Sequence, residues 1–194
     1  MYILDRTNGK PLIGIEERPV PQEPRQKTSK TQPYPIGDAT VPQCAEPLEG
    51  YEKAGCIFEV FWEEPVVIQP SGVGGTNCAP MSYNPDTGSF YVVATVRTSA
   101  FVRYGDAFKK GLRYVGGTRS APIGSPMGGT FTAVGGNTNK IVWLTKTPYR
   151  IGNGGGCTTT AGGLVFHGEP DDNMQAYDAK TGELLQQFQT GSSA

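Results

Sequence analysis

The chain has 194 residues, with 17 basic and 18 acidic residues and a formal net charge of −1. Its 27 glycines, its 16 prolines and a charged fraction of 18% indicate an all-β protein of short strands and shaped loops. The near-neutral charge, with no basic run longer than Lys109-Lys110, gives no reason to expect a nucleic-acid or anionic membrane partner. No apolar stretch is long enough for a membrane span.

Residues 1–13 have the pattern strand, turn, strand, and they contain a motif that returns twice later in the chain. The motif is Ala-x-Asp-x-x-Thr-Gly followed by a large residue. Its copies are Ile3, Asp5, Asn8, Gly9 and Ile13; then Ala133, Gly135, Thr138, Asn139 and Trp143; then Ala176, Asp178, Thr181, Gly182 and Gln186. Asp accepts backbone hydrogen bonds, Gly takes the positive φ that closes the turn, and the large residue is expected to pack between neighbouring sheets. A period in the low forties built from strands and turns is typical of a β-propeller.

Residues 14–56 are rich in proline, so they form either a linker or an ordered excursion, and Tyr34-Pro35 and Cys44 favour the excursion. Cys44 and Cys56 are twelve residues apart in this stretch and form either a disulfide or two separate thiols. A single histidine and no CxxC pair argue against a zinc site. Cys78 and Cys157 are expected in the core.

Residues 57–146 are predicted to form a blade, with a hairpin at 82–94 and a basic, Gly-rich insertion at 95–128. The insertion is either a docking surface or, as we favour, a solvated loop. Residues 149–191 form the last blade, most of it within 162–191. The prediction is one domain over 1–194, a partial β-propeller of two to three four-stranded antiparallel blades, with exposed apolar residues near 2–4 and along the last blade.

Three runs then resemble one family: MYILDRTNGKPL (1–12), GVGGTNCAPMSYNPDTGSFYV (72–92) and NGGGCTTTAGGLVFHGEPDDNMQAYDAKTGELLQQFQTG (153–191). Together and in this order they are similar to the second half of the propeller of PQQ-dependent quinoprotein alcohol dehydrogenases. The resemblance implies an eight-bladed propeller with PQQ and calcium at its axis, alcohol oxidation, electron transfer to a c-type cytochrome and a periplasmic location.

The resemblance implies only a few site residues here. Asn77 matches the family asparagine that approaches the quinone oxygens, where an amide donor would stabilise developing negative charge. The alternative is an asparagine that caps a tight turn. Gly154 and Gly155, in the glycine loop 152–156, could approach the cofactor through backbone amides, although Gly154 stands where the family often has a tryptophan.

The family's catalytic aspartate and calcium ligands would lie upstream of Met1, so no catalytic or metal-binding residue is expected in this chain. Asp5 and Asp178 are assigned to turns, Asp171-Asp172 to an acidic turn, and His167 to packing or the surface rather than to a base. The prediction is a C-terminal fragment that needs the remaining blades, binds neither PQQ nor calcium alone and is inactive in isolation. The alternative is a non-catalytic propeller used for binding or scaffolding.

Overall fold

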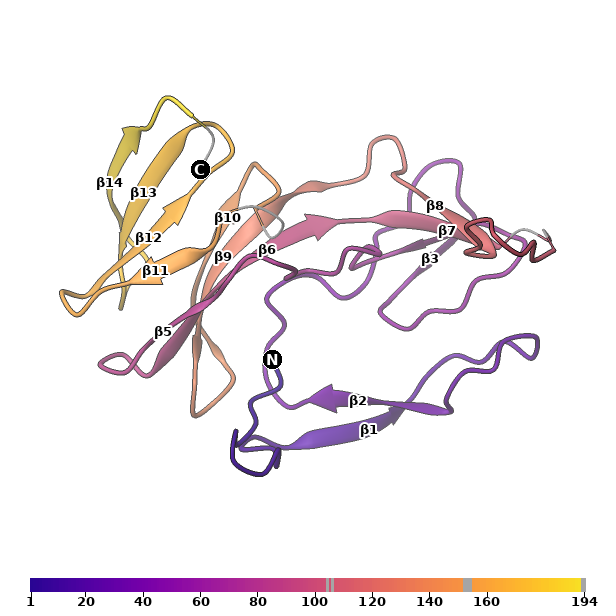
Figure 1. Ribbon diagram of the computed structural model, residues 1–194, viewed down its shortest axis with the longest axis horizontal. Helices are drawn as coiled ribbons and strands as arrows, with labels where there is room; N and C mark the ends of the chain where they lie inside the picture. The colour runs from indigo at the N-terminus through magenta and orange to yellow at the C-terminus, as the bar shows by residue number, and fades with distance from the viewer. Residues whose placement is uncertain (104, 106, 152–154, 193–194) are drawn as a thin grey trace.

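The computed structural model describes residues 1–103, 105, 107–151 and 155–192. In this part of the chain the regular elements are fourteen strands, β1 to β14, and no helix (Figure 1). The strands form three four-stranded sheets and one two-stranded sheet. The predicted all-β class is therefore confirmed, and no helical segment of the described chain has the length and apolar character that a membrane crossing needs.

The middle sheet has the order β10-β9-β6-β5, and all of its strand pairs are antiparallel. Its strands are β5 (Ser82–Asn84), β6 (Ser89–Arg97), β9 (Met127–Gly135) and β10 (Ile141–Thr147). Side chains alternate between the two faces of a strand, yet Tyr91 and Val92 are 0% and 1% exposed. Both faces of β6 are thus covered, which explains its nearly continuous apolar sequence.

The last sheet follows chain order, β11-β12-β13-β14, and is fully antiparallel. Its strands are β11 (Cys157–Thr159), β12 (Leu164–Gly168), β13 (Asn173–Asp178) and β14 (Leu184–Gln189). The prediction that residues 162–191 form most of one four-stranded blade is confirmed. Every residue of β14 is exposed, and Phe188 keeps 50% of its surface accessible. Tyr2 and Leu4 are also exposed, at 52% and 48%, as expected.

The recurring motif forms the turns that its residue types predict. The Asp178 carboxylate accepts the backbone N–H groups of Lys180 and Thr181 at 2.9 and 2.8 Å, and Gly182 has a φ of 74°. These hydrogen bonds hold the pKa of Asp178 below its usual value. In the middle copy Asn139 stands where the others have glycine, and it too has a positive φ, of 54°.

The large residue of the middle motif, Trp143, fixes the middle sheet to the last one. Its Nε1–H donates to the Ala179 carbonyl at 3.0 Å, and the Tyr91 hydroxyl donates to the same oxygen at 2.9 Å. Phe131 and Tyr177 complete the aromatic cluster, with ring centroids 5.2 Å apart. The sequence prediction that Trp143 packs between sheets is therefore correct.

The third four-stranded sheet, β3-β4-β7-β8, departs from the sequence prediction in two ways. It comprises β3 (Lys53–Gly55), β4 (Val66–Ile68), β7 (Ser99–Arg103) and β8 (Gly117–Ser120). β3 pairs with β4 in parallel, so the expectation of antiparallel strands throughout is wrong there. In addition, two stretches of the 95–128 insertion are strands, because β7 pairs with the buried apolar β4 and β8 pairs with β7.

The Pro-rich stretch contains an antiparallel hairpin of β1 (Ile15–Pro19) and β2 (Thr31–Pro35). Farther on, a disulfide joins Cys44 and Cys56. Of the other two cysteines, Cys157 is buried as expected, but Cys78 is exposed. The core assignment of Cys78 was wrong because the loop that precedes β5 leaves this side chain at the surface.

Candidate functional site at the facing edges of two sheets

The two sequence runs expected near a cofactor meet where β5 faces β11. Asn84 donates its amide to the Thr159 hydroxyl at 3.0 Å, and the backbone N–H of Cys157 donates to the Pro80 carbonyl at 3.2 Å. β5 and β11 are also the edge strands of their sheets (Figure 1). Pro80, at the end of the 72–80 run, and Cys157, in the 155–157 run, therefore lie side by side where the edges of the two sheets meet.

Asn77 lies in the loop that leads to Pro80 and β5, and its side chain is exposed. One of its amide N–H groups donates to the Val73 carbonyl at 3.3 Å, across a turn in which Gly74 has a φ of 73°. An amide has two N–H donors and one acceptor oxygen, so this bond leaves capacity for a ligand. The geometry thus combines a turn-capping contact with a side chain accessible from outside, and the cofactor role of Asn77 stays a prediction.

The glycine loop supplies the other half of the edge. Gly154 falls outside the described residues, whereas Gly155 is half-buried. The next glycine, Gly156, lies directly against Pro80, and a Cβ there would be 2.4 Å from the Pro80 ring. Sequence reasoning missed Gly156 as the contact residue, because only the pairing of distant strands brings it to Pro80.

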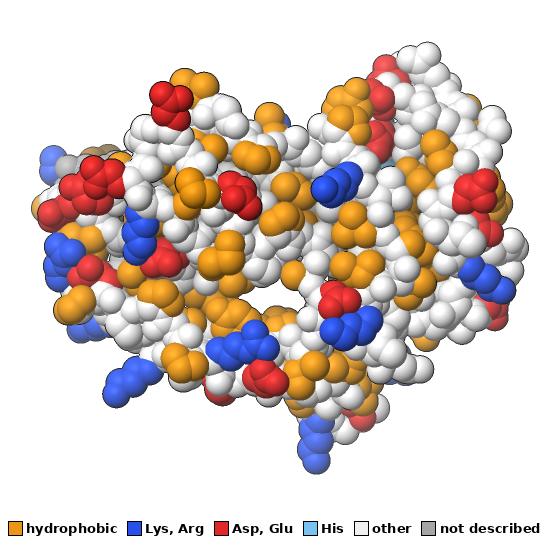
Figure 2. All heavy atoms as spheres, turned by 180° about the vertical axis from the view of Figure 1, so that it is seen from behind, with side chains coloured by type: hydrophobic (Ala, Val, Ile, Leu, Met, Phe, Trp, Pro, Cys, Tyr) orange, Lys and Arg blue, Asp and Glu red, His pale blue; other side chains and the backbone are white. Residues whose placement is uncertain are grey.

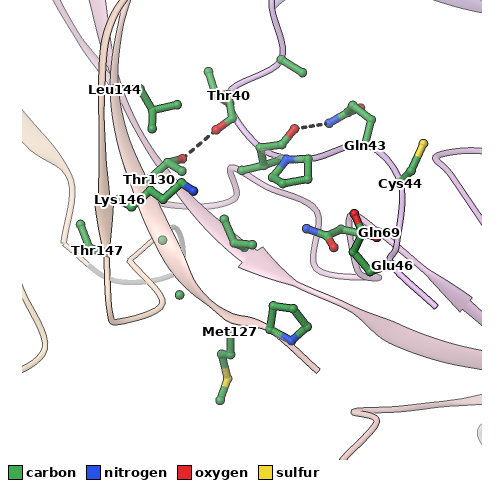
Figure 3. Close-up of a pocket in the computed structure, with 17 residues that line it drawn as sticks. Thr40, Gln43, Cys44, Glu46, Gln69, Met127, Thr130, Leu144, Lys146 and Thr147 are labelled. Atoms are coloured by element: carbon green, nitrogen blue, oxygen red, sulfur yellow. Dashed lines mark hydrogen bonds between the residues drawn. The ribbon is translucent and has the colours of Figure 1, made fainter. Parts of the chain in front are cut away.

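A cavity of about 690 Å³ lies between the 39–46 segment and one face of the middle sheet (Figure 3). Thr130 donates to the Thr40 carbonyl at 2.8 Å and so ties the two walls together. Gln69 and Lys146 also line this cavity. A second cavity, of about 530 Å³, is lined in part by Gly74, Gly75 and Thr76. Neither cavity is lined by Asn77 or Gly155.

Charged groups of both signs are interspersed over the face in Figure 2, without a large field of one sign. At the tip of the β7–β8 hairpin, Lys109 and Arg113 are exposed beside apolar side chains, among them Phe108 at 68%. The segment is thus a solvated connection with two strand stretches.

Among the described residues, the buried histidine and carboxylate side chains are those of His167 and Glu169, 1% and 3% exposed. Burial lowers the pKa of His167, and the hydrogen bond with the Gly156 carbonyl has a smaller effect in the opposite direction. Burial, with the nearby charge of Asp171, raises the pKa of Glu169. His167 lies inside β12 and stacks on Phe131, with ring centroids 5.1 Å apart, so its assignment to packing is confirmed. In the described residues no three His, Cys, Asp or Glu side chains lie close enough together to hold a metal ion.

Comparison with known proteins identifies the family. The PQQ family model, described as the β-propeller domain of glucose/ethanol/alcohol dehydrogenases, matches residues 1–110, which is more than half of the chain. The chain belongs to this PQQ-dependent dehydrogenase family. The resemblance carried by the three sequence runs is therefore confirmed.

Some curated relatives match nearly the whole of this chain. Quinoprotein alcohol dehydrogenase PedH of Pseudomonas putida is 35% identical over 98% of this chain and 30% of its own length. Lanthanide-dependent methanol dehydrogenase of Methylorubrum extorquens is 30% identical over 98% of this chain and 30% of its own length. The solved quinohemoprotein alcohol dehydrogenase of Comamonas testosteroni superposes on all of this chain and 27% of its own, with a TM-score of 0.66 and 25% identity.

These structural neighbours are propellers, so the four-stranded sheets are propeller blades. The chain spans 30% of the length of PedH and 30% of the length of the lanthanide-dependent methanol dehydrogenase.

Proposed function

We propose that the chain contributes three blades, with the facing edges of the middle and last blades, to a PQQ- and calcium-dependent alcohol dehydrogenase. In this proposal the enzyme is periplasmic, oxidises small alcohols and passes electrons to a c-type cytochrome. The observation that carries it is the meeting of the 72–80 and 155–157 runs along one edge of the two blades, within a chain that belongs to the PQQ-dependent family. The remaining blades are the partners that complete the site.

The residues present fit one side of a flat cofactor with polar oxygens at its rim. Asn77 offers an N–H donor from an exposed side chain, and Gly155 offers backbone without a side chain in the way. When bound, PQQ supplies the two-electron chemistry that accepts hydride from the alcohol. Asn77 would donate its second N–H to a quinone oxygen, because the bond to the Val73 carbonyl already orients the amide.

The other chemistry of this reaction falls to the rest of the enzyme. Alcohol oxidation needs a base for the hydroxyl proton and a cation that polarises the quinone. His167 and Glu169 are too deeply buried to reach an alcohol, and Asp178 is engaged in its turn. The isolated chain is therefore expected to show no alcohol oxidation, even with PQQ and calcium added.

The metal of the proposed enzyme has a second candidate. One relative is named a lanthanide-dependent methanol dehydrogenase, so a lanthanide ion is the alternative to calcium. Reconstitution of the full-length protein with each ion, followed by measurement of turnover, distinguishes the two. Activity with the lanthanide and none with calcium would replace calcium in the proposal.

The principal test is Asn77→Ala in the full-length protein. We expect turnover to fall about 10-fold to 1000-fold, the usual cost of removing one preorganised donor. Asn8→Ala is the matched control, because Asn8 is an exposed turn asparagine far along the chain from this edge, and its turnover should be unchanged. If Asn77→Ala turns over normally, Asn77 is only a turn residue. If the unmodified full-length protein binds no quinone, the non-catalytic propeller replaces the enzyme.

A further inference from the structure

The only histidine of the chain connects the last blade to the glycine loop. His167 lies on β12 directly opposite Cys157 of β11, and its Nδ1 is 3.3 Å from the carbonyl oxygen of Gly156. Gly156 in turn packs against Pro80, and Cys157 donates its N–H to the Pro80 carbonyl. The imidazole therefore holds the loop from inside the protein at the point where it contacts the 72–80 run.

The partner of Nδ1 decides which ring nitrogen carries the proton. A carbonyl oxygen can only accept, so Nδ1 must be the donor in this hydrogen bond. In the neutral ring Nε2 then carries a lone pair instead of a proton, and it is buried without a hydrogen-bond partner among the described residues. Phe131 packs against the ring from β9, and His167 is 1% exposed.

The group nearest to Nε2 is Glu169, whose Oε1 is 3.9 Å away. A protonated carboxyl would face this lone pair favourably, whereas a carboxylate would repel it. Burial, together with Asp171, favours the protonated carboxyl, and burial favours the neutral imidazole. Of the two neutral tautomers, the one with its proton on Nδ1 is the form that can donate to the Gly156 carbonyl.

We propose that His167 is a positioning residue for the cofactor edge: its Nδ1–H fixes the Gly156 backbone against Pro80. The consequence for quinone binding rests on the proposed function. The positioning itself concerns only contacts within this chain and can be tested without any cofactor.

Three substitutions separate positioning from packing. In Asn the side-chain nitrogen is as many bonds from Cα as Nδ1 is in His, so His167→Asn keeps the donor and loses ring volume. His167→Gln places its amide nearer to Nε2 and removes the Nδ1 donor. His167→Phe keeps an aromatic ring against Phe131 and removes both nitrogens. If His167 only filled space, Phe would be the best replacement and Asn the worst.

The first measurement is hydrogen exchange of the Cys157 amide, which donates to Pro80. We expect protection close to that of the unmodified protein in His167→Asn, and a loss of about 3-fold to 10-fold in His167→Gln and His167→Phe, the usual range for one net hydrogen bond. Protection highest in His167→Phe and lowest in His167→Asn would overturn the proposal.

The second measurement is the quinone dissociation constant of the full-length protein, followed by absorbance without turnover. The same order is expected, with binding about 3-fold to 10-fold weaker for Gln and Phe than for Asn. Equal quinone affinity in all three variants would overturn the link between His167 and the cofactor edge. If the unmodified protein binds no quinone, the proposed function fails, while the hydrogen-exchange order still supports or overturns the positioning role.

Discussion

The middle and last sheets together form what we call the two-blade unit. The forces that stabilise this unit differ from those that stabilise the 14–56 segment. Between the middle and last sheets, buried aromatic rings meet across the interface, and Tyr91, Phe131 and Trp143 are all at most 9% exposed. Within residues 14–56, all of which the structure describes, Val41 is the one buried apolar side chain. That segment relies on the Cys44–Cys56 disulfide and on polar contacts.

The polar contacts of the segment reach other parts of the chain. The Asp38 carboxylate accepts the backbone N–H of Ile141 at 2.9 Å and pairs with Lys140. The Arg25 guanidinium lies 4.6 Å from the centre of the Trp62 ring. Where a second sheet is present, apolar burial stabilises the fold; where none covers the chain, a covalent bond and directional contacts do so.

Trp143→Ala should have the largest effect and should act on the two-blade unit. It removes a buried ring and its hydrogen bond to Ala179, and substitutions of this kind lower the free energy of unfolding by about 3–5 kcal/mol. Leu144→Ala is the control, because Leu144 is the next residue of β10 and is 38% exposed. Urea unfolding measures both. A similar loss in the two variants would contradict the view that the aromatic interface stabilises this unit.

Replacing both Cys44 and Cys56 by Ser should destabilise the 14–56 segment. Losing a disulfide costs about 2–4 kcal/mol, and the change should increase hydrogen exchange around residues 39–57 while β6 and β9 stay protected. Cys78→Ser, at an exposed position outside the disulfide, serves as the control. Equal increases of exchange in both regions would show that they unfold as one unit.

A pair of glycine substitutions separates backbone strain from the contact between blades. Gly182 and Gly163 have φ values of 74° and 79°, but a Cβ at Gly182 would lie 2.6 Å from Trp143, whereas one at Gly163 would meet no atom within 4 Å. Gly163→Ala should cost about 1–2 kcal/mol from strain alone. Gly182→Ala should cost about 1–3 kcal/mol more, from overpacking. Equal losses of unfolding free energy would mean that the Trp143 ring moves aside without cost.

The pH dependence of stability should show the smallest effect and belongs to the blade interface. Burial lowers the pKa of His167 below 6.5, so the unfolded chain binds this proton first as the pH falls. The contribution is present above pH 6.5 and is lost as pH falls towards the folded pKa, with a slope of at most about 1.4 kcal/mol per pH unit.

His167→Phe should remove this slope from urea midpoints measured between pH 5 and pH 7. Glu169, beside Asp171 and Tyr177, has a raised pKa and acts in the opposite sense: its contribution is lost as pH rises from 4.5 through the folded pKa. Glu169→Gln should remove this opposing contribution, so the net loss of stability as pH falls should become steeper. If the slope is unchanged in His167→Phe, groups other than His167 cause it.

Much of the fold could be read from short stretches of sequence. The turn at Asp178 and Gly182 is set by residues four apart, and its hydrogen bonds form within the turn itself. Trp143 could be assigned to an interface because it follows such a turn at a fixed distance. The same reasoning found the runs around Asn77 and Gly155, because each run is continuous in the chain.

Contacts between distant residues could not be read in this way. Cys78 was assigned to the core, although its side chain is exposed in the loop before β5. The strands of the 95–128 insertion were not assigned to a sheet, because β7 finds its partner in β4, some thirty residues earlier (Val66 against Phe101). The parallel pairing of β3 with β4 was missed because parallel strands are joined by a long connection rather than by a recognisable turn.

The sequence by itself thus determined the turns, the strand character, the blade period and the family, since each depends on residues close together in the chain. Only the tertiary structure decided which edges face each other, and so placed Gly156 against Pro80 and His167 behind Gly156. The physical reason is that hydrogen bonds between strands carry little sequence information, so partners far apart in the chain are selected by the packing of whole sheets.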